Sequence, residues 1–217
     1  MSRLGLLLLS ALLFAGAASA VEDPPESCRP KVAGTALALA GDAERAQMKC
    51  DIDRAAQLVA RSDRRAATAP RPVVRVVDTA SPSGTAYIYD VIGALPNYWL
   101  EARNVPSEES ERTRVPVCTL GTNIPADVSQ LISHELKAAA SQALPEYGAR
   151  EDIQINPDGS KRVVLLLDTH DIITTVETEA GTRHFSRHAR ASDEIARLNQ
   201  TIIGVANFSD SWVCNTN

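Results

Sequence analysis

Four cysteines constrain the fold of this chain more than any other feature, because they lie far apart in the sequence, at Cys28, Cys50, Cys118 and Cys214. None of them stands in the paired C-x-x-C spacing of a zinc site, so they predict disulfide bonds, which form in oxidising compartments outside the cytosol. Four cysteines can pair in several ways. We favour Cys28 with Cys50, which would fasten the proline-rich N-terminal segment to a helix. Cys118 with Cys214 would then fasten the C-terminal tail.

The N-terminal segment 1–20 has the layout of a cleavable signal peptide. Arg3 precedes an apolar run over residues 4–18, and small residues at Ala18 and Ala20 come directly before acidic residues and prolines. The apolar run is shorter than the ~20 residues of a membrane-spanning helix. We expect cleavage after Ala20 and a periplasmic or secreted protein with no transmembrane segment after cleavage.

The rest of the chain, residues 21–217, is long enough to form a single domain with a real core. Within it we expect an N-terminal helical segment and linker over residues 21–72 and a sheet-containing core over residues 73–217. The formal net charge is −5, and it becomes more negative when Arg3 is removed. This charge argues against nucleic acid or anionic lipid as a partner. The excess of arginine over lysine and the many alanines are typical of a GC-rich bacterial genome.

Apolar periodicity predicts three helices, over Asp42–Ser62, over Pro125–Leu144, and after a cap at Ser192. Alternating apolar and polar residues between turn signals predict strands in hairpins and in a C-terminal meander. The predicted strands are Val73–Thr79, Tyr87–Ile92, Tyr98–Val105, Val115–Leu120, Ile153–Ile155, Arg162–Asp168, Ile172–Thr178 and Arg183–His188. Because helices and strands are segregated along the chain, we predict an α+β fold with an antiparallel sheet.

Three residues are candidates for acid–base catalysis. Glu135 projects into the apolar stripe of the second helix, where a carboxylate is either held by a salt bridge or available as an acid or base. Asp168 and His170 follow an apolar strand, and a carboxylate that orients an imidazole can serve as a general base. The alternative for this polar cluster is a turn or cap. No nucleophile motif accompanies these residues.

The aromatic residues Tyr87, Tyr89, Tyr98 and Trp99 are concentrated in one part of a chain that is otherwise poor in aromatics. Tyr87 and Tyr89 share one face of a strand, since strand side chains alternate. Exposed rings of this kind contact sugars or protein partners, while buried ones simply belong to a core. We take these four residues as candidate binding residues.

His184 and His188 lie on one predicted strand, ~13 Å apart, too far to share an ion. We therefore predict no metal site and no cofactor. Glu177 is expected to face His184 across the hairpin as a surface pair. The leading hypothesis is a non-enzymatic periplasmic or secreted protein that binds an envelope protein or glycan. The alternative is a periplasmic hydrolase that uses Glu135, Asp168 and His170.

Overall fold

The structure is a computed structural model. It describes residues 41–62, 69–79, 85–106, 115–141, 144–148, 151–155, 158–165 and 170–215. The predicted signal peptide, Cys28 and Asp168 lie outside the described residues.

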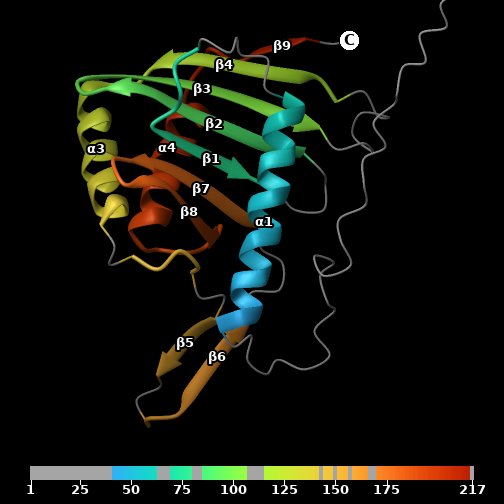
Figure 1. Cartoon of the computed structure of the whole chain (residues 1–217), viewed down its shortest axis with the longest axis vertical. Helices are drawn as coiled ribbons and strands as arrows, with labels where there is room; N and C mark the ends of the chain where they lie inside the picture. The colour runs from blue at the N-terminus through green and yellow to red at the C-terminus, as the bar shows by residue number, and fades with distance from the viewer. Residues whose placement is uncertain are drawn as a thin grey trace, which may run out of the picture. The chain divides into compact units, whose positions relative to one another are not determined.

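A seven-stranded antiparallel sheet forms the centre of the fold, with strand order β8-β7-β1-β2-β3-β4-β9 (Figure 1). Its strands are β1 (Val74–Asp78), β2 (Thr85–Ala94), β3 (Asn97–Pro106), β4 (Val117–Asn123), β7 (Asp171–Thr178), β8 (Gly181–His188) and β9 (Val213–Asn215). A separate hairpin consists of β5 (Glu151–Ile155) and β6 (Lys161–Leu165). Among the described residues, the helices are α1 (Gly41–Ser62), α3 (Ala126–Ala140) and α4 (Glu194–Asn207). The predicted α+β fold is confirmed.

Helices cover both faces of the sheet, and the two neighbours Val76 and Val77 show how. Successive strand residues point to opposite faces. Val76 belongs to the larger core cluster, with Ile132 of α3 and Leu198 of α4. Val77 belongs to a smaller cluster with Ala55 of α1. Figure 1 accordingly shows α1 crossing one face and α3 and α4 behind the other.

The predicted hairpin of Val73–Thr79 with Tyr87–Ile92 is present as the pair β1 and β2, with Val76 opposite Tyr89, and a second tight turn joins β2 to β3. Gly93 has a φ of +100°, and a Cβ at this position would come within 2.9 Å of the carbonyl oxygen of Asn97. Only glycine fits such a backbone without strain. The two strands on either side of this turn, β2 and β3, are paired along their whole length, from Thr85 opposite Pro106 to Ala94 opposite Asn97.

The predicted C-terminal meander is divided between two sheets. β5 and β6 pair only with each other, whereas β7 lies beside β1, with Val176 opposite Val74. The short strand β9 is an addition, because residues 213–215 show no strand pattern in the sequence. It pairs with β4.

Two helix boundaries also differ from the prediction. Asp193, not Ser192, is the N-cap of α4, since its side chain accepts a hydrogen bond from the backbone N–H of Ala196. α3 ends at Ala140 because Ser141 is extended, although Leu144 still packs against the core.

A disulfide bond joins Cys118 of β4 to Cys214 of β9, across 96 residues of sequence, as predicted. Cys50 is also disulfide-bonded. Its expected partner, Cys28, is outside the described part of the chain, so that pairing stays a prediction. No described helix combines the length and the apolar character needed to cross a membrane.

Candidate functional site

One end of the sheet face that carries α3 and α4 forms a pocket of about 440 Å³. The sheet register sets its floor, because Tyr87 of β2 lies between Asp78 of β1 and Asn104 of β3. The end of α4 and the residues that follow it supply the other walls. We call this site the tyrosine pocket; it is lined by Asp78, Tyr87, Tyr89, Asn104, Cys118, Ile203, Asn207, Trp212 and Cys214.

Aromatic rings form one wall of the tyrosine pocket. The ring of Tyr87 stacks on Tyr89 at 6.3 Å between centroids and meets the edge of Trp212 at 6.5 Å. Tyr87 is 36% exposed, while Tyr89 is buried. The indole N–H of Trp212 donates to the carbonyl oxygen of Ala206, 2.9 Å away, which fixes the indole at the end of α4. Tyr87 is thus an accessible ring on a rigid base.

A contact between an imidazole and a carboxylate lies beside these rings. Nε2 of His170 is 2.8 Å from Oδ1 of Asp78, and both side chains are partly exposed. Burial, followed by the negative charge of Asp78 and by Tyr87, raises the pKa of Tyr89 well above its usual value. The Tyr89 phenol is therefore protonated at neutral pH.

The side-chain amide of Asn104 has a structural role, because it bonds to the backbone of the neighbouring segment. Its Nδ2 donates to the carbonyl oxygen of Pro116 at 2.9 Å, and its Oδ1 accepts from the backbone N–H of Cys118 at 2.6 Å. Asn207, in contrast, is exposed at the end of α4 and makes no side-chain hydrogen bond to any described residue. Asn207 can therefore reach a ligand without breaking an existing bond.

The four aromatic residues of the predicted binding set do not form one surface. Tyr87 and Tyr89 line the tyrosine pocket, but Tyr98 is buried in the larger core cluster. Trp99 points to the opposite face, where its ring lies over Gly121; a Cβ there would come within 2.8 Å of it. Strand alternation explains the separation of Tyr98 from Trp99. Sequence reasoning missed Trp212, which lies between α4 and β9 and reaches the pocket through the packing of both elements.

The three predicted catalytic residues are not gathered by the described structure. Glu135 is 5% exposed, and its Oε1 lies 3.4 Å from Nε of Arg197, while Oε2 is buried without a hydrogen bond to any described group. The hydrogen bond from Arg197 to Glu135 raises the pKa of Arg197. His170 pairs with Asp78 instead. Asp168 lies outside the described residues.

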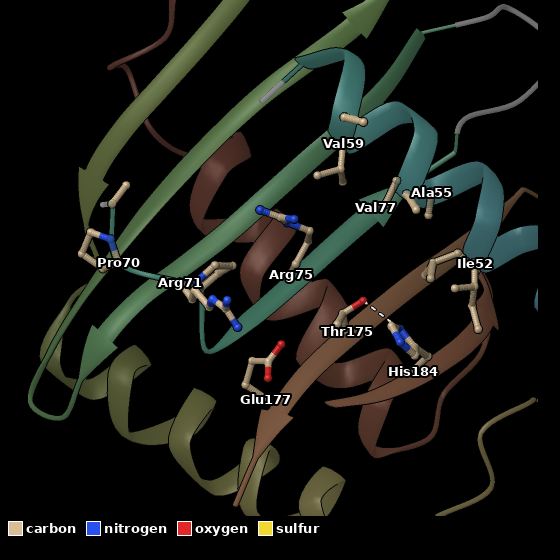
Figure 2. Close-up of a pocket in the computed structure, with 15 residues that line it drawn as sticks. Ile52, Ala55, Val59, Pro70, Arg71, Arg75, Val77, Thr175, Glu177 and His184 are labelled. Atoms are coloured by element: carbon tan, nitrogen blue, oxygen red, sulfur yellow. Dashed lines mark hydrogen bonds between the residues drawn. The ribbon is translucent and has the colours of Figure 1, made fainter. Parts of the chain in front are cut away.

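A second pocket, of about 560 Å³, lies between α1 and the opposite face of the sheet (Figure 2). We call it the α1 pocket. It is lined by Ile52, Ala55, Ala56, Val59 and Ala60 of α1, by Ala69, Pro70, Arg71 and Pro72, and by Arg75, Val77, Ile173, Thr175, Glu177 and His184 of the sheet.

A buried carboxylate stands next to the α1 pocket. Asp90 is fully buried and pairs with Arg75 at 2.5 Å and with Arg103 at 2.8 Å. Nε of Arg103 also donates to the hydroxyl of Ser62, at the end of α1.

The expected pairing of Glu177 with His184 across the β7–β8 hairpin is wrong. Glu177 lies opposite Thr182, and His184 lies opposite Thr175.

No group of three or more histidine, cysteine or acidic side chains in the described segments could hold a metal ion. No family model, curated protein or solved structure was found to match this chain.

Proposed function

We propose that this chain is a non-enzymatic binding protein, exported to the periplasm or secreted, that holds one or two sugar units of an envelope glycan in the tyrosine pocket. The observation that carries the proposal is the accessible ring of Tyr87, held between Tyr89 and Trp212 at the wall of a pocket. A flat ring presents an apolar face on which the C–H face of a sugar can pack.

The polar groups around this ring suit a ligand rich in hydroxyl groups. Asp78 accepts hydrogen bonds, the phenol of Tyr89 can donate one, and the amide of Asn207 can do both. The pocket volume of about 440 Å³ is at the small end of the range for small-molecule sites. A compact, polar ligand with one apolar face therefore fits better than an extended apolar one.

The two tryptophans of the chain offer a direct test. Trp212 lines the tyrosine pocket and Trp99 lies on the other face, so Trp99→Phe leaves Trp212 as the only indole. We expect mono- and disaccharides of N-acetylglucosamine and glucose to produce a saturable change in the fluorescence of this variant. A panel of such sugars that produces no saturable change would contradict the proposal.

A matched pair of variants then assigns the binding to the ring. Tyr87 and Trp99 are exposed to nearly the same extent, 36% and 37%, on opposite faces. We expect Tyr87→Ala to weaken binding by about tenfold, in line with the loss of an anchoring aromatic contact. Trp99→Ala, measured by calorimetry, should leave the affinity unchanged. Equal losses in both variants would point to a general effect on folding.

A periplasmic hydrolase is the second candidate, and the pair formed by Asp78 and His170 is what favours it. A carboxylate that fixes an imidazole is a common arrangement for a general base. Turnover of nitrophenyl glycosides or esters that His170→Ala abolishes, and that Glu135→Gln leaves intact, would support a hydrolase built on His170. Sugar binding without turnover would support the binding protein.

A further inference from the structure

Apolar side chains of α1 and of the sheet form one wall of the α1 pocket. α1 presents Ile52, Ala55 and Val59 toward Val77 and Ile173 of the sheet, as Figure 2 shows for the first four of these. Ala56, on the same helix, also lines the pocket and is exposed. The pocket volume of about 560 Å³ lies within the range of small-molecule sites.

The other side of the same pocket carries arginine N–H groups that no described residue uses. Arg71 is exposed and makes no hydrogen bond or ion pair with any described residue. Arg75 uses Nε and Nη2 for Asp90, so its Nη1 is available. Nδ1 of His184 and the hydroxyl of Thr175 lie 3.1 Å apart and share a hydrogen bond, the dashed line in Figure 2.

The charges around these donors favour an anion. Asp90 is a single carboxylate shared by two guanidinium groups, those of Arg75 and Arg103. Arg71 adds a further positive charge, and Glu177 is the one acid among the described lining residues. Guanidinium groups bind carboxylates well, because their N–H donors match the two carboxylate oxygens.

From this combination we infer that the α1 pocket binds a small amphipathic carboxylate, such as a medium-chain fatty acid. The acyl chain lies along the apolar wall formed by Ile52, Ala55 and Val59. The carboxylate lies at Arg71 and Nη1 of Arg75. The site is on the opposite sheet face from the tyrosine pocket, and the inference does not rest on the function proposed above.

Calorimetric titration of the mature chain with decanoate, below the concentration at which it forms micelles, tests the inference. We expect saturable binding. Arg71→Gln should weaken it by about twofold to fivefold, because an exposed cation contributes modestly. The matched control is Arg54→Gln, which removes an exposed arginine of α1 outside the pocket and should change nothing. Decan-1-ol, the neutral analogue, should bind equally to the parent chain and to Arg71→Gln.

A second variant tests the position of the acyl chain. Ala56→Trp adds a large side chain at the pocket wall from an exposed helix position, and it should abolish binding of both decanoate and decan-1-ol. Absence of saturable decanoate binding would overturn the inference, as would equal effects of Arg71→Gln and Arg54→Gln. Binding that appears only after residues 63–68 are replaced by glycine and serine would overturn it too, because this chain's own linker would then be the occupant.

Discussion

Tyr89 illustrates how burial changes the chemistry of one side chain. It is 3% exposed, and its ring stacks on Tyr87. Burial contributes most to its raised pKa, and the negative charge of Asp78 adds to the effect, since both disfavour the phenolate. The usual pKa of this group is 10.0. In the unfolded chain the phenol therefore ionises at a pH where the folded protein keeps its proton.

The first prediction concerns alkaline stability. Because the folded state binds a proton that the unfolded state releases, the free energy of unfolding falls as the pH rises above about 10. The contribution of Tyr89 is fully present below that pH. We expect Tyr89→Phe to lose stability less steeply above about pH 10 than the parent chain. Urea unfolding at a series of pH values measures both slopes, and equal slopes would contradict the prediction.

Glu135 shows what residue-level reasoning could and could not predict. Its place in the apolar stripe follows from the helical period, and the structure buries it as expected. Its partner Arg197 could not be predicted, because α4 follows α3 by many residues and the packing of the two helices is not encoded locally. The pairing of His170 with Asp78 is hidden for the same reason, since it depends on β7 lying beside β1.

At the scale of elements, the start of α4 depends on a buried arginine. Arg187 of β8 is 1% exposed and donates to the carbonyl oxygens of Pro145, Glu146 and Ser186. It also pairs with Oδ2 of Asp193, whose Oδ1 caps the helix. One carboxylate therefore serves both as the cap of α4 and as the counter-charge for Arg187.

The second prediction separates the capping role of Asp193 from its role as the counter-charge of Arg187. Asp193→Ser keeps a capping oxygen but leaves Arg187 without a negative partner. We expect a loss of about 2 kcal/mol, below the usual cost of breaking a buried pair because Asp193 is partly exposed. Asp193→Ala should lose about 1 kcal/mol more, the value of an N-cap. Asp210→Ser is the exposed control and should change stability by less than about 0.5 kcal/mol. Urea unfolding measures all three, and equal stabilities of the Ser and Ala variants would exclude the capping contribution.

The elements themselves were more predictable than their arrangement. α1 and the strands β2, β3, β7 and β8 appear close to their expected positions, because apolar periodicity and turn residues act over short distances. The sheet order was not predictable, since the contact of β1 with β7 joins segments separated by α3 and by the β5–β6 hairpin. β9 has three exposed residues and no apolar alternation, so only Cys214 indicated that this segment is held in place.

For the whole molecule, the bond between Cys118 and Cys214 is the main long-range constraint in the described structure. It joins two residues that are 96 positions apart, and the chain between them contains α3, β5, β6, β7, β8 and α4. In the chain-entropy model, a loop of this length stabilises the folded state by about 4 to 5 kcal/mol. The bond also holds β9 against β4, at the edge of the sheet.

The third prediction follows from that loop. The double variant Cys118→Ser, Cys214→Ser should be less stable than the parent by about 4 kcal/mol in urea unfolding under oxidising conditions. The indole of Trp212 should also become more exposed, because it directly precedes β9; its fluorescence in a Trp99→Phe background reports this. A double variant as stable as the parent, with unchanged fluorescence, would show that packing alone holds the C-terminal strand.

Cys118 and Cys214 are both wall residues of the tyrosine pocket. Oxidation of the two thiols therefore does more than stabilise the chain, since it also completes the cavity. Under the binding function proposed above, a reduced polypeptide would lack the covalent link between two residues that line the site. The bond would then couple the redox state of the surroundings to the shape of the pocket.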